Sequence, residues 1–248
     1  SWTISPTPLP APGTPTGLSC VSESLCVAVT SQGYTLETAH PANETSWTTQ
    51  RPDPENELTA VSCPSAALCV ASDSGGHVLL STDPAAGSWS SLPVEPGMAL
   101  NGVSCASASA CVAVDAAGRV VWSTSPTSSG AWHVLGFPPG GHAPLRGVGC
   151  AGNLCVAVGA SGETLVTSSG PSGPWHLSEA EPARELEAIS CSPSGACVAL
   201  DGAGTLLASA DPAATPATWS STSIASGGAG ATVSCPDALC VAAQGSEA

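Results

Sequence analysis

Residues 103–114, VSCASASACVAV, hold two cysteines in a setting that returns six times along this chain of 248 residues. The pairs are Cys20 with Cys26, Cys63 with Cys69, Cys105 with Cys111, Cys150 with Cys155, Cys191 with Cys197 and Cys235 with Cys240. The first cysteines of successive pairs stand 43, 42, 45, 41 and 44 residues apart. A repeat of this length is typical of a four-stranded propeller blade. The sequence therefore predicts an all-β fold: a six-bladed β-propeller of four-stranded antiparallel blades with one disulfide per blade, forming a single domain over residues 1–248.

One repeat shows the expected strands. Residues 58–63, 69–72, 77–82 and 88–92 are apolar or alternating segments that we interpret as its four strands. Between the second and third strands, residues 73–76 read Asp-Ser-Gly-Gly, where the aspartate accepts hydrogen bonds from the turn backbone and a glycine supplies a positive φ. The other repeats follow the same order.

Tryptophan marks the fourth strand of every repeat, at Trp2, Trp47, Trp89, Trp132, Trp175 and Trp219. A large aromatic residue at one fixed place per repeat indicates an anchor in the core between blades, with ligand stacking as the alternative. The seventh tryptophan, Trp122, breaks the pattern because it stands in a third strand. We expect Trp122 to be the exposed ring.

Each cysteine pair is predicted to close the first hairpin of its own blade. Facing residues of paired strands lie close enough for a disulfide, and such short loops contribute roughly 2 kcal/mol each in the chain-entropy model. Structural zinc sites gather two cysteine pairs around one ion, whereas these six pairs would lie on six separate blades. The pattern therefore favours disulfides, and with them an oxidising compartment outside the cell or at its surface.

Charge and hydropathy exclude two classes of partner. The chain has four arginines, no lysine and a formal net charge of −15. Nucleic acids and anionic membranes bind through Lys and Arg, so neither is an expected partner. Nor does any apolar run approach the 18 or so residues of a membrane helix, so membrane insertion is not expected. The first residues are Ser1-Trp2 rather than Met, which a removed signal peptide or a trimmed fragment would explain.

The two ends of the sequence complement each other. Residues 2–5 carry a fourth-strand signal, and residues 231–243 carry a first and a second strand. We therefore expect the N-terminal strand to close the last blade. No third strand follows before Ala248. Either the natural chain continues past Ala248, or a neighbouring chain supplies the strand and links subunits into a polymer.

Residues 81–89, 123–132 and 209–219 resemble stretched forms of the Asp-box, the Ser-x-Asp-x-Gly-x-x-Trp hairpin of neuraminidase-repeat propellers. The whole chain resembles the exported, cysteine-paired propeller repeats common in actinobacterial proteins, for which no activity is established. Sialidases, which contain Asp-boxes, bind their substrate carboxylate through three arginines and use a Tyr/Glu nucleophile pair. Here Tyr34 is the only tyrosine and the arginines fall irregularly, so sialidase activity is disfavoured.

Candidate binding residues are those that break the repeat, because residues that merely build a blade recur. They are Arg51, Asp53, Glu55, Glu57, Glu95, Trp122, His142, Arg146, Glu181, Arg184 and Glu185. All but Trp122 lie in loops that join one blade to the next. These carboxylates form a rim that could bind Ca²⁺, with Asp73, Asp115 and Asp201 nearby. The alternatives are that the loops are simply solvated and that these three aspartates serve only their turns.

Three classes of function remain open. The first is a secreted, non-catalytic recognition or scaffold module that binds a glycan, a protein or copies of itself. The alternative is a glycan hydrolase or lyase that uses rim carboxylates, which would need two carboxyl groups roughly 5 to 10 Å apart, one of them with a raised pKa. The third is a metal-binding or redox protein.

Overall fold

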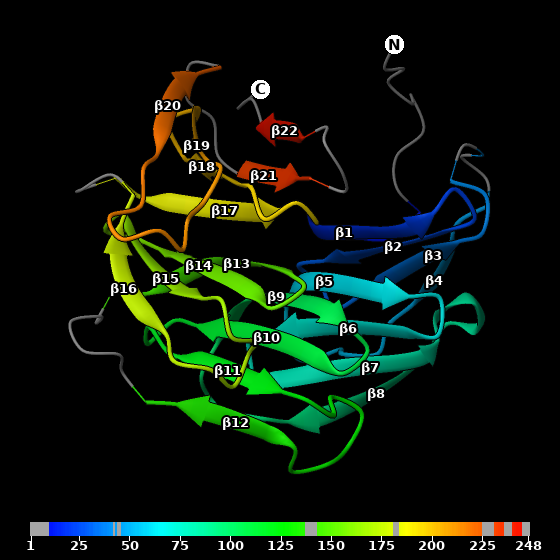
Figure 1. The fold of residues 1–248 in the computed structure, drawn as a ribbon. Helices are drawn as coiled ribbons and strands as arrows, with labels where there is room; N and C mark the ends of the chain where they lie inside the picture. Colours follow the sequence, from blue (N-terminus) through cyan, green and yellow to red (C-terminus); the bar gives the residue numbers. More distant parts are fainter. Residues whose placement is uncertain are drawn as a thin grey trace. The chain divides into compact units, whose positions relative to one another are not determined.

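A computed structural model describes residues 10–41, 43, 46–136, 143–180, 184–224, 231–235 and 240–244. It confirms the predicted all-β blades: five antiparallel four-stranded sheets follow one another in chain order, and the described residues add a two-stranded sheet (Figure 1). The chain divides into two compact units, Ser1–Leu100 and Asn101–Ala248. Among the described residues, no helix has the length and apolarity needed to cross a membrane.

The first unit contains two blades. Blade 1 consists of β1 (Pro15–Ser22), β2 (Leu25–Thr30), β3 (Thr35–Thr38) and β4 (Thr48–Gln50). Blade 2 consists of β5 (Leu58–Ser65), β6 (Leu68–Asp73), β7 (His77–Asp83) and β8 (Ser88–Pro93), with the 3-10 turn η1 (Pro84–Ala86) between β7 and β8. In both blades the four strands lie side by side in chain order, so that consecutive strands of the blade pair with each other.

The second unit holds the remaining blades, and β9 begins at the residue before it. Blade 3 consists of β9 (Leu100–Ser107), β10 (Ala110–Asp115), β11 (Val120–Ser123) and β12 (Trp132–Leu135). Blade 4 consists of β13 (Leu145–Ala151), β14 (Leu154–Gly159), β15 (Glu163–Thr167) and β16 (His176–Glu179). Blade 5 consists of β17 (Leu186–Cys191), β18 (Cys197–Asp201), β19 (Thr205–Ser209) and β20 (Ser220–Ser223). The described part of blade 6 is β21 (Ala231–Ser234) and β22 (Val241–Gln244).

The disulfide prediction is confirmed in every repeat, which leaves no free cysteine. The bonded pairs are Cys20 and Cys26, Cys63 and Cys69, Cys105 and Cys111, Cys150 and Cys155, Cys191 and Cys197, and Cys235 and Cys240. In blade 1 the two cysteines face each other across β1 and β2, and the same register holds in blades 4 and 5. The bridges therefore close hairpins locally and join no blade to another.

Within each unit, the core lies between consecutive blades. Second-strand valines of one blade contact the first strand of the next: Val27 and Val29 meet Val61, and Val156 and Val158 meet Ile189. Trp89, Trp175 and Trp219 pack into three such clusters, as predicted for inter-blade anchors. The predicted strand at residues 2–5, and its pairing with blade 6, lie outside the described residues.

A glycine with positive φ ends the turn between the second and third strands of blades 1 to 5. The residues are Gly33, Gly76, Gly118, Gly162 and Gly204, with φ of 77°, 88°, 80°, 84° and 83°. A Cβ at Gly33 would overlap the carbonyl oxygen of Asp53, and one at Gly76 would overlap that of Glu95. The loop leaving each of these two blades thus lies directly on the blade's own turn, which brings loop side chains close to turn side chains.

Candidate functional site

The aspartates that begin three of these turns accept backbone hydrogen bonds, as the sequence predicts. Asp73 Oδ1 accepts from the amides of Gly75 (2.9 Å) and His77 (2.7 Å). Asp115 and Asp201 make the same two bonds, at 2.9 and 2.8 Å and at 3.0 and 2.6 Å. All three residues are buried. A buried carboxylate thus holds each turn in shape.

The second carboxylate oxygen distinguishes the three turns. Asp115 Oδ2 accepts from Arg119 Nε at 2.7 Å, and Asp201 Oδ2 accepts from Arg184 Nη1 at 2.6 Å. Asp73 Oδ2 instead lies 2.7 Å from Nδ1 of His77, an imidazole that is charged only when protonated. Blades 3 and 5 therefore neutralise their turn aspartate with a permanent positive charge, and blade 2 does not.

The loop between β4 and β5 adds a second buried carboxyl group to the blade 2 turn. Asp53 Oδ1 accepts from the amides of Glu55 (3.1 Å) and Asn56 (3.0 Å), and Asn56 Nδ2 donates to both carboxylate oxygens. Asp53, Asp73 and His77 each offer an atom that could bind a metal, and these atoms lie within 4.8 Å of one another. We call these three residues the blade 2 cluster.

The two carboxyl groups of the blade 2 cluster share a hydrogen bond that moves their pKa values apart. Burial, and then the bond to Asp53, raise the pKa of Asp73. Burial opposes ionisation of Asp53 as well, but hydrogen bonds from Asp73, from Asn56 and from the loop backbone outweigh it and lower the pKa of Asp53. Of the two carboxyl groups, Asp73 is therefore the one that binds a proton more readily, and its protonated form can donate to Asp53.

A cation could take the place of that shared proton. Two carboxylates and an imidazole suit Zn²⁺ or another transition metal better than Ca²⁺, which takes six to eight oxygen ligands. The Ca²⁺ site expected from the sequence stays a prediction. A melting temperature raised by millimolar Ca²⁺ and lowered again by a chelator would support it.

The other predicted residues of the β4–β5 loop lie around the blade 2 cluster. The Arg51 guanidinium stands 5.1 Å from the ring centroid of Tyr34 and donates to the carbonyl oxygens of Gln32 and Pro54. Glu55 and Glu57 are exposed. Glu95, in the loop after β8, is half-buried. Arg51 is therefore held against its own blade, and the two exposed glutamates point to solvent.

Three predicted residues of the second unit come together. Arg184 and Glu185 line a small cavity of about 270 Å³ with residues 201–203. Glu185 also accepts a hydrogen bond from Arg146 at 2.7 Å, in an exposed ion pair. His142 and Glu181 lie outside the described residues. The structure thus gathers arginine and carboxylate here, and each charge has a partner of opposite sign.

Trp122 is half-buried. Its ring packs against the core between blades 3 and 4, and it lies 4.6 Å from the imidazole of His133 between ring centroids, tilted by 38°. Much of the ring expected to be exposed is therefore covered by protein.

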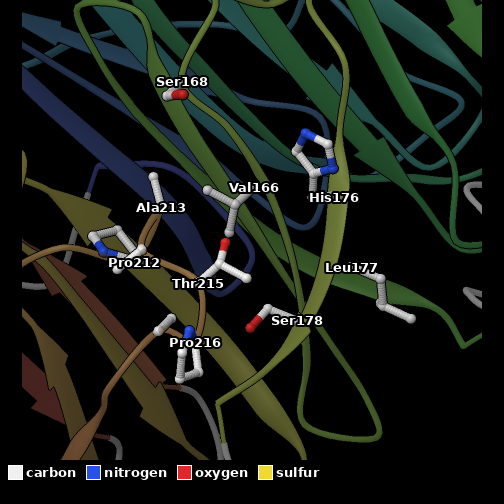
Figure 2. A pocket seen from close by; sticks show the side chains of 11 residues that line it. Val166, Ser168, His176, Leu177, Ser178, Pro212, Ala213, Thr215 and Pro216 are labelled. Carbon is white, nitrogen blue, oxygen red and sulfur yellow. The ribbon is translucent and has the colours of Figure 1, made fainter.

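A second cavity, which the sequence reasoning missed, lies between blades 4 and 5. It has a volume of about 260 Å³ and is lined by Val166, Ser168, residues 176–178 and residues 212–217. Figure 2 shows Val166, Thr215 and Ser178 in the middle of the group, with Pro212 and Pro216 on one side and His176 on the other. We call this cavity the β16 pocket. Its outer wall belongs to residues 209–219, the longest of the three segments that resemble an Asp-box.

Comparison with known proteins supports the fold and no more. The sequence matches no family model and no curated protein. Among solved structures, "YCF48 bound to D1 peptide" aligns with a TM-score of 0.62 at 17% identity, covering 87% of this chain and 68% of that one. YCF48 from Cyanidioschyzon merolae gives 0.61 at 16%, covering 86% and 73%, and the computationally designed protein Ika8 gives 0.64 at 16%, covering 93% and 68%. The chain is a β-propeller like these proteins.

Proposed function

We propose that this protein is an exported, non-catalytic binding module that takes an extended peptide segment at the β16 pocket. The observation that carries the proposal is the position of this cavity beside an open strand edge. In the described part of the chain, β16 pairs with β15 alone. Its other edge can offer backbone hydrogen bonds to an added strand, while the cavity receives one of the peptide's alternate side chains.

The lining of the β16 pocket fits a peptide side chain better than a sugar. Val166, Pro212 and Pro216 are apolar, while Ser168, Ser178 and Thr215 offer hydroxyl groups. Among the lining residues the only ring with a π-face is the imidazole of His176, so a sugar ring would find no large aromatic platform there. A volume of about 260 Å³ falls just below the usual range for whole ligands, which favours a single apolar side chain.

The net charge of this chain indicates which residues should flank the bound side chain of the peptide. A net charge of −15 on this chain attracts cationic partners over long range, so basic residues should flank the apolar side chain. The structure titled "YCF48 bound to D1 peptide" is similar to this chain in fold, but the two sequences are only 17% identical. It therefore supports peptide binding by analogy of fold and not by shared binding residues.

The rim carboxylates support the hydrolase or lyase alternative less well. Asp53 and Asp73 are buried and already accept hydrogen bonds from backbone amides of the loop and the turn. Glu185 is paired with Arg146. A glycosidase needs two carboxyl groups that reach a substrate. The six disulfides support export, because a reducing cytosol would open them. We further propose that residues 1–248 form one domain of the exported, cysteine-paired type that the sequence resembles.

A display experiment tests this function. Peptides selected on the purified protein should share an apolar residue flanked by Lys or Arg, and Ser178→Trp, which fills the cavity, should weaken their binding at least tenfold. Thr222→Trp is the matched control, because Thr222 holds the same fourth-strand position in blade 5 and is exposed outside the pocket. Equal binding by parent and Ser178→Trp, or binding to a glycan array instead of peptides, would overturn the proposal.

A further inference from the structure

Three residues that hold the same position in the third strand of their blades differ in size. Each pairs with the valine that directly follows the second cysteine of the blade. The residues are Glu37 in blade 1, Trp122 in blade 3 and Val166 in blade 4, opposite Val27, Val112 and Val156. Glutamate and tryptophan reach further from the strand than valine does, so the position provides a comparison of filled and unfilled space.

In blades 1 and 3 the larger side chain packs against its surroundings. Glu37 is only 2% exposed, and its Oε1 accepts a hydrogen bond from Nε1 of Trp89 in blade 2 at 2.9 Å. Trp122 packs on the core between blades 3 and 4. The Trp122 ring also lies 4.6 Å from the imidazole of His133, its partner on the neighbouring strand. A large side chain thus fills this position in both blades.

In blade 4 the β16 pocket lies at this position. Val166 pairs with His176 across β15 and β16, as Trp122 pairs with His133 across β11 and β12. Val166 and His176 both line the pocket, and Figure 2 shows the imidazole to one side of the valine. Blade 4 therefore repeats the histidine of blade 3 beside a valine instead of an indole ring.

The connection between β19 and β20, which forms the other wall of the pocket, also differs from its counterpart in blade 4. There, Trp175 Nε1 donates to the carbonyl oxygen of Pro171 in the connection before it, at 3.2 Å. Trp219 Nε1 is buried and has no acceptor among the described residues. The connection of blade 5 thus lacks the bond that ties the connection of blade 4 to its tryptophan, and its residues 212–217 line the pocket.

We propose that the β16 pocket is a receptor for an aromatic ring, and that the bound peptide places a tryptophan side chain there, over Val166 and against His176. This inference rests on the proposed peptide site and adds the identity of its anchor residue. The chain itself provides the precedent, because the indole of Trp122 lies against the equivalent histidine of blade 3.

The chemistry of the pocket fits an indole. An indole N–H is a donor only, and the hydroxyl groups of Ser168, Ser178 and Thr215 in the lining can accept from it. His176 is exposed, so one face of its imidazole is open to a ring. Contact between two rings adds affinity beyond the area that is buried, which an aliphatic side chain does not gain. Tryptophan is also among the residues that contribute most at protein interfaces.

Calorimetric titration of the full chain with four heptapeptides tests the proposal. Their sequence is Lys-Thr-Lys-Xaa-Lys-Thr-Lys, in which Xaa is Trp, Phe, Leu or Ala. The tryptophan peptide should bind about tenfold more tightly than the leucine peptide, with phenylalanine between them and alanine weakest. Equal affinity for the tryptophan and leucine peptides would overturn the ring site and leave peptide binding standing.

Two matched histidine variants locate the ring. His176→Ala removes the imidazole of the pocket and should reduce the preference for tryptophan over leucine to about threefold. His133→Ala is the control, because it removes the equivalent exposed imidazole of blade 3 outside the pocket, and it should leave the preference unchanged. Both side chains are exposed, so both variants should fold, which the melting temperature checks. An undiminished preference in His176→Ala would contradict the placement of the ring.

N-acetyltryptophan amide separates ring binding from strand addition, because it is too short to add a strand. It should shift the imidazole proton resonances of His176 and leave those of His133 unchanged. If it does so while no heptapeptide binds, the ring site stands and the proposed peptide function fails. If neither histidine responds and the heptapeptides do not bind, both proposals fail.

Discussion

The turns of blades 2 and 5 have the same backbone and opposite electrostatics. In both, a buried aspartate accepts two amide hydrogen bonds, and a side chain from the loop before the blade reaches that aspartate. The loop supplies Arg184 to Asp201 in blade 5 and a second carboxyl group, Asp53, to Asp73 in blade 2. The residue that the preceding loop places beside the turn aspartate therefore differs between the two blades: it is an arginine in blade 5 and a second carboxyl group in blade 2.

The two aspartates respond to their partners in opposite directions. Burial favours the neutral form of Asp201, but hydrogen bonds from Thr205, Arg184 and Ala203 outweigh it and lower its pKa. The pKa of Asp73 is raised. The same scaffold thus favours the ionised form of the aspartate in blade 5 and the protonated form of the aspartate in blade 2.

Removing either turn aspartate should have the largest effect. Asp73→Ala and Asp201→Ala each leave two turn amides without their acceptor, so each should cost about 2–3 kcal/mol of unfolding free energy. Urea denaturation at pH 7 measures the cost. Asn at either position keeps one acceptor oxygen and should recover much of the loss. A cost under about 0.5 kcal/mol for both Ala variants would show that the carboxylates do not hold the turns.

The pH dependence of stability should have opposite signs in the two turns. Asp73 binds its proton more tightly folded than unfolded, so its contribution is full below the ordinary value of 3.8 and is lost as the pH rises through its folded pKa. Asp201 behaves in reverse: its contribution is present above 3.8 and is lost as the pH falls through its lowered pKa.

Urea unfolding between pH 3 and pH 7 separates the two contributions. Asp73→Asn should remove the loss of stability on the alkaline side of 3.8, and Asp201→Asn should remove the loss on the acid side. The sign of the slope of unfolding free energy against pH is the quantity that distinguishes the two variants. Identical pH profiles for the two Asn variants would contradict the comparison.

Giving Asp73 of blade 2 an arginine partner, as Asp115 has in blade 3, should make the two turns alike in charge. His77→Arg places a permanent charge where Arg119 stands beside Asp115, and it should lower the pKa of Asp73. We expect a gain of about 1 kcal/mol at pH 7 and a similar loss from the reverse change, Arg119→His. Carbon-13 NMR titration of the carboxyl groups reports the pKa, and calorimetry reports the stability. Destabilisation by His77→Arg at pH 7 would count against a proton-sharing pair in the parent.

The exposed ion pair of Arg146 and Glu185 should matter least. Both side chains are largely in solvent, where such pairs contribute about 0–1 kcal/mol and are screened by salt. Arg146→Gln should lower the unfolding free energy by about 0.5 kcal/mol at low salt and by nothing measurable in 0.5 M NaCl. Arg184→Gln is the comparison, and it should keep its cost in salt because Asp201 is buried.

Local pattern predicted the blades and the turns. A cysteine pair six residues apart and flanked by valines can close only a hairpin, so the bond between Cys63 and Cys69 followed from spacing. The turn role of Asp73 followed from the glycines after it. The meeting of Asp53 with Asp73 could not be predicted, because it depends on the path by which the β4–β5 loop settles on Gly33.

Surfaces that form only when blades pack against each other could not be predicted from the sequence either. The half-burial of Trp122 depends on its contacts with blade 4 and on His133, which its repeat position does not reveal. The β16 pocket needs residues 212–217 to lie over a strand of the preceding blade. The unusual length of that connection was the only signal available.

The glycine that ends each turn marks a place where the repeat can be engineered. The backbone at this glycine cannot change, because the loop carbonyl occupies the space of any side chain at Gly33 and Gly76. The next position already differs in every complete blade: Tyr34, His77, Arg119, Glu163 and Thr205. A library randomised at these five positions would therefore vary charge, ring and hydroxyl on a constant frame, one blade at a time.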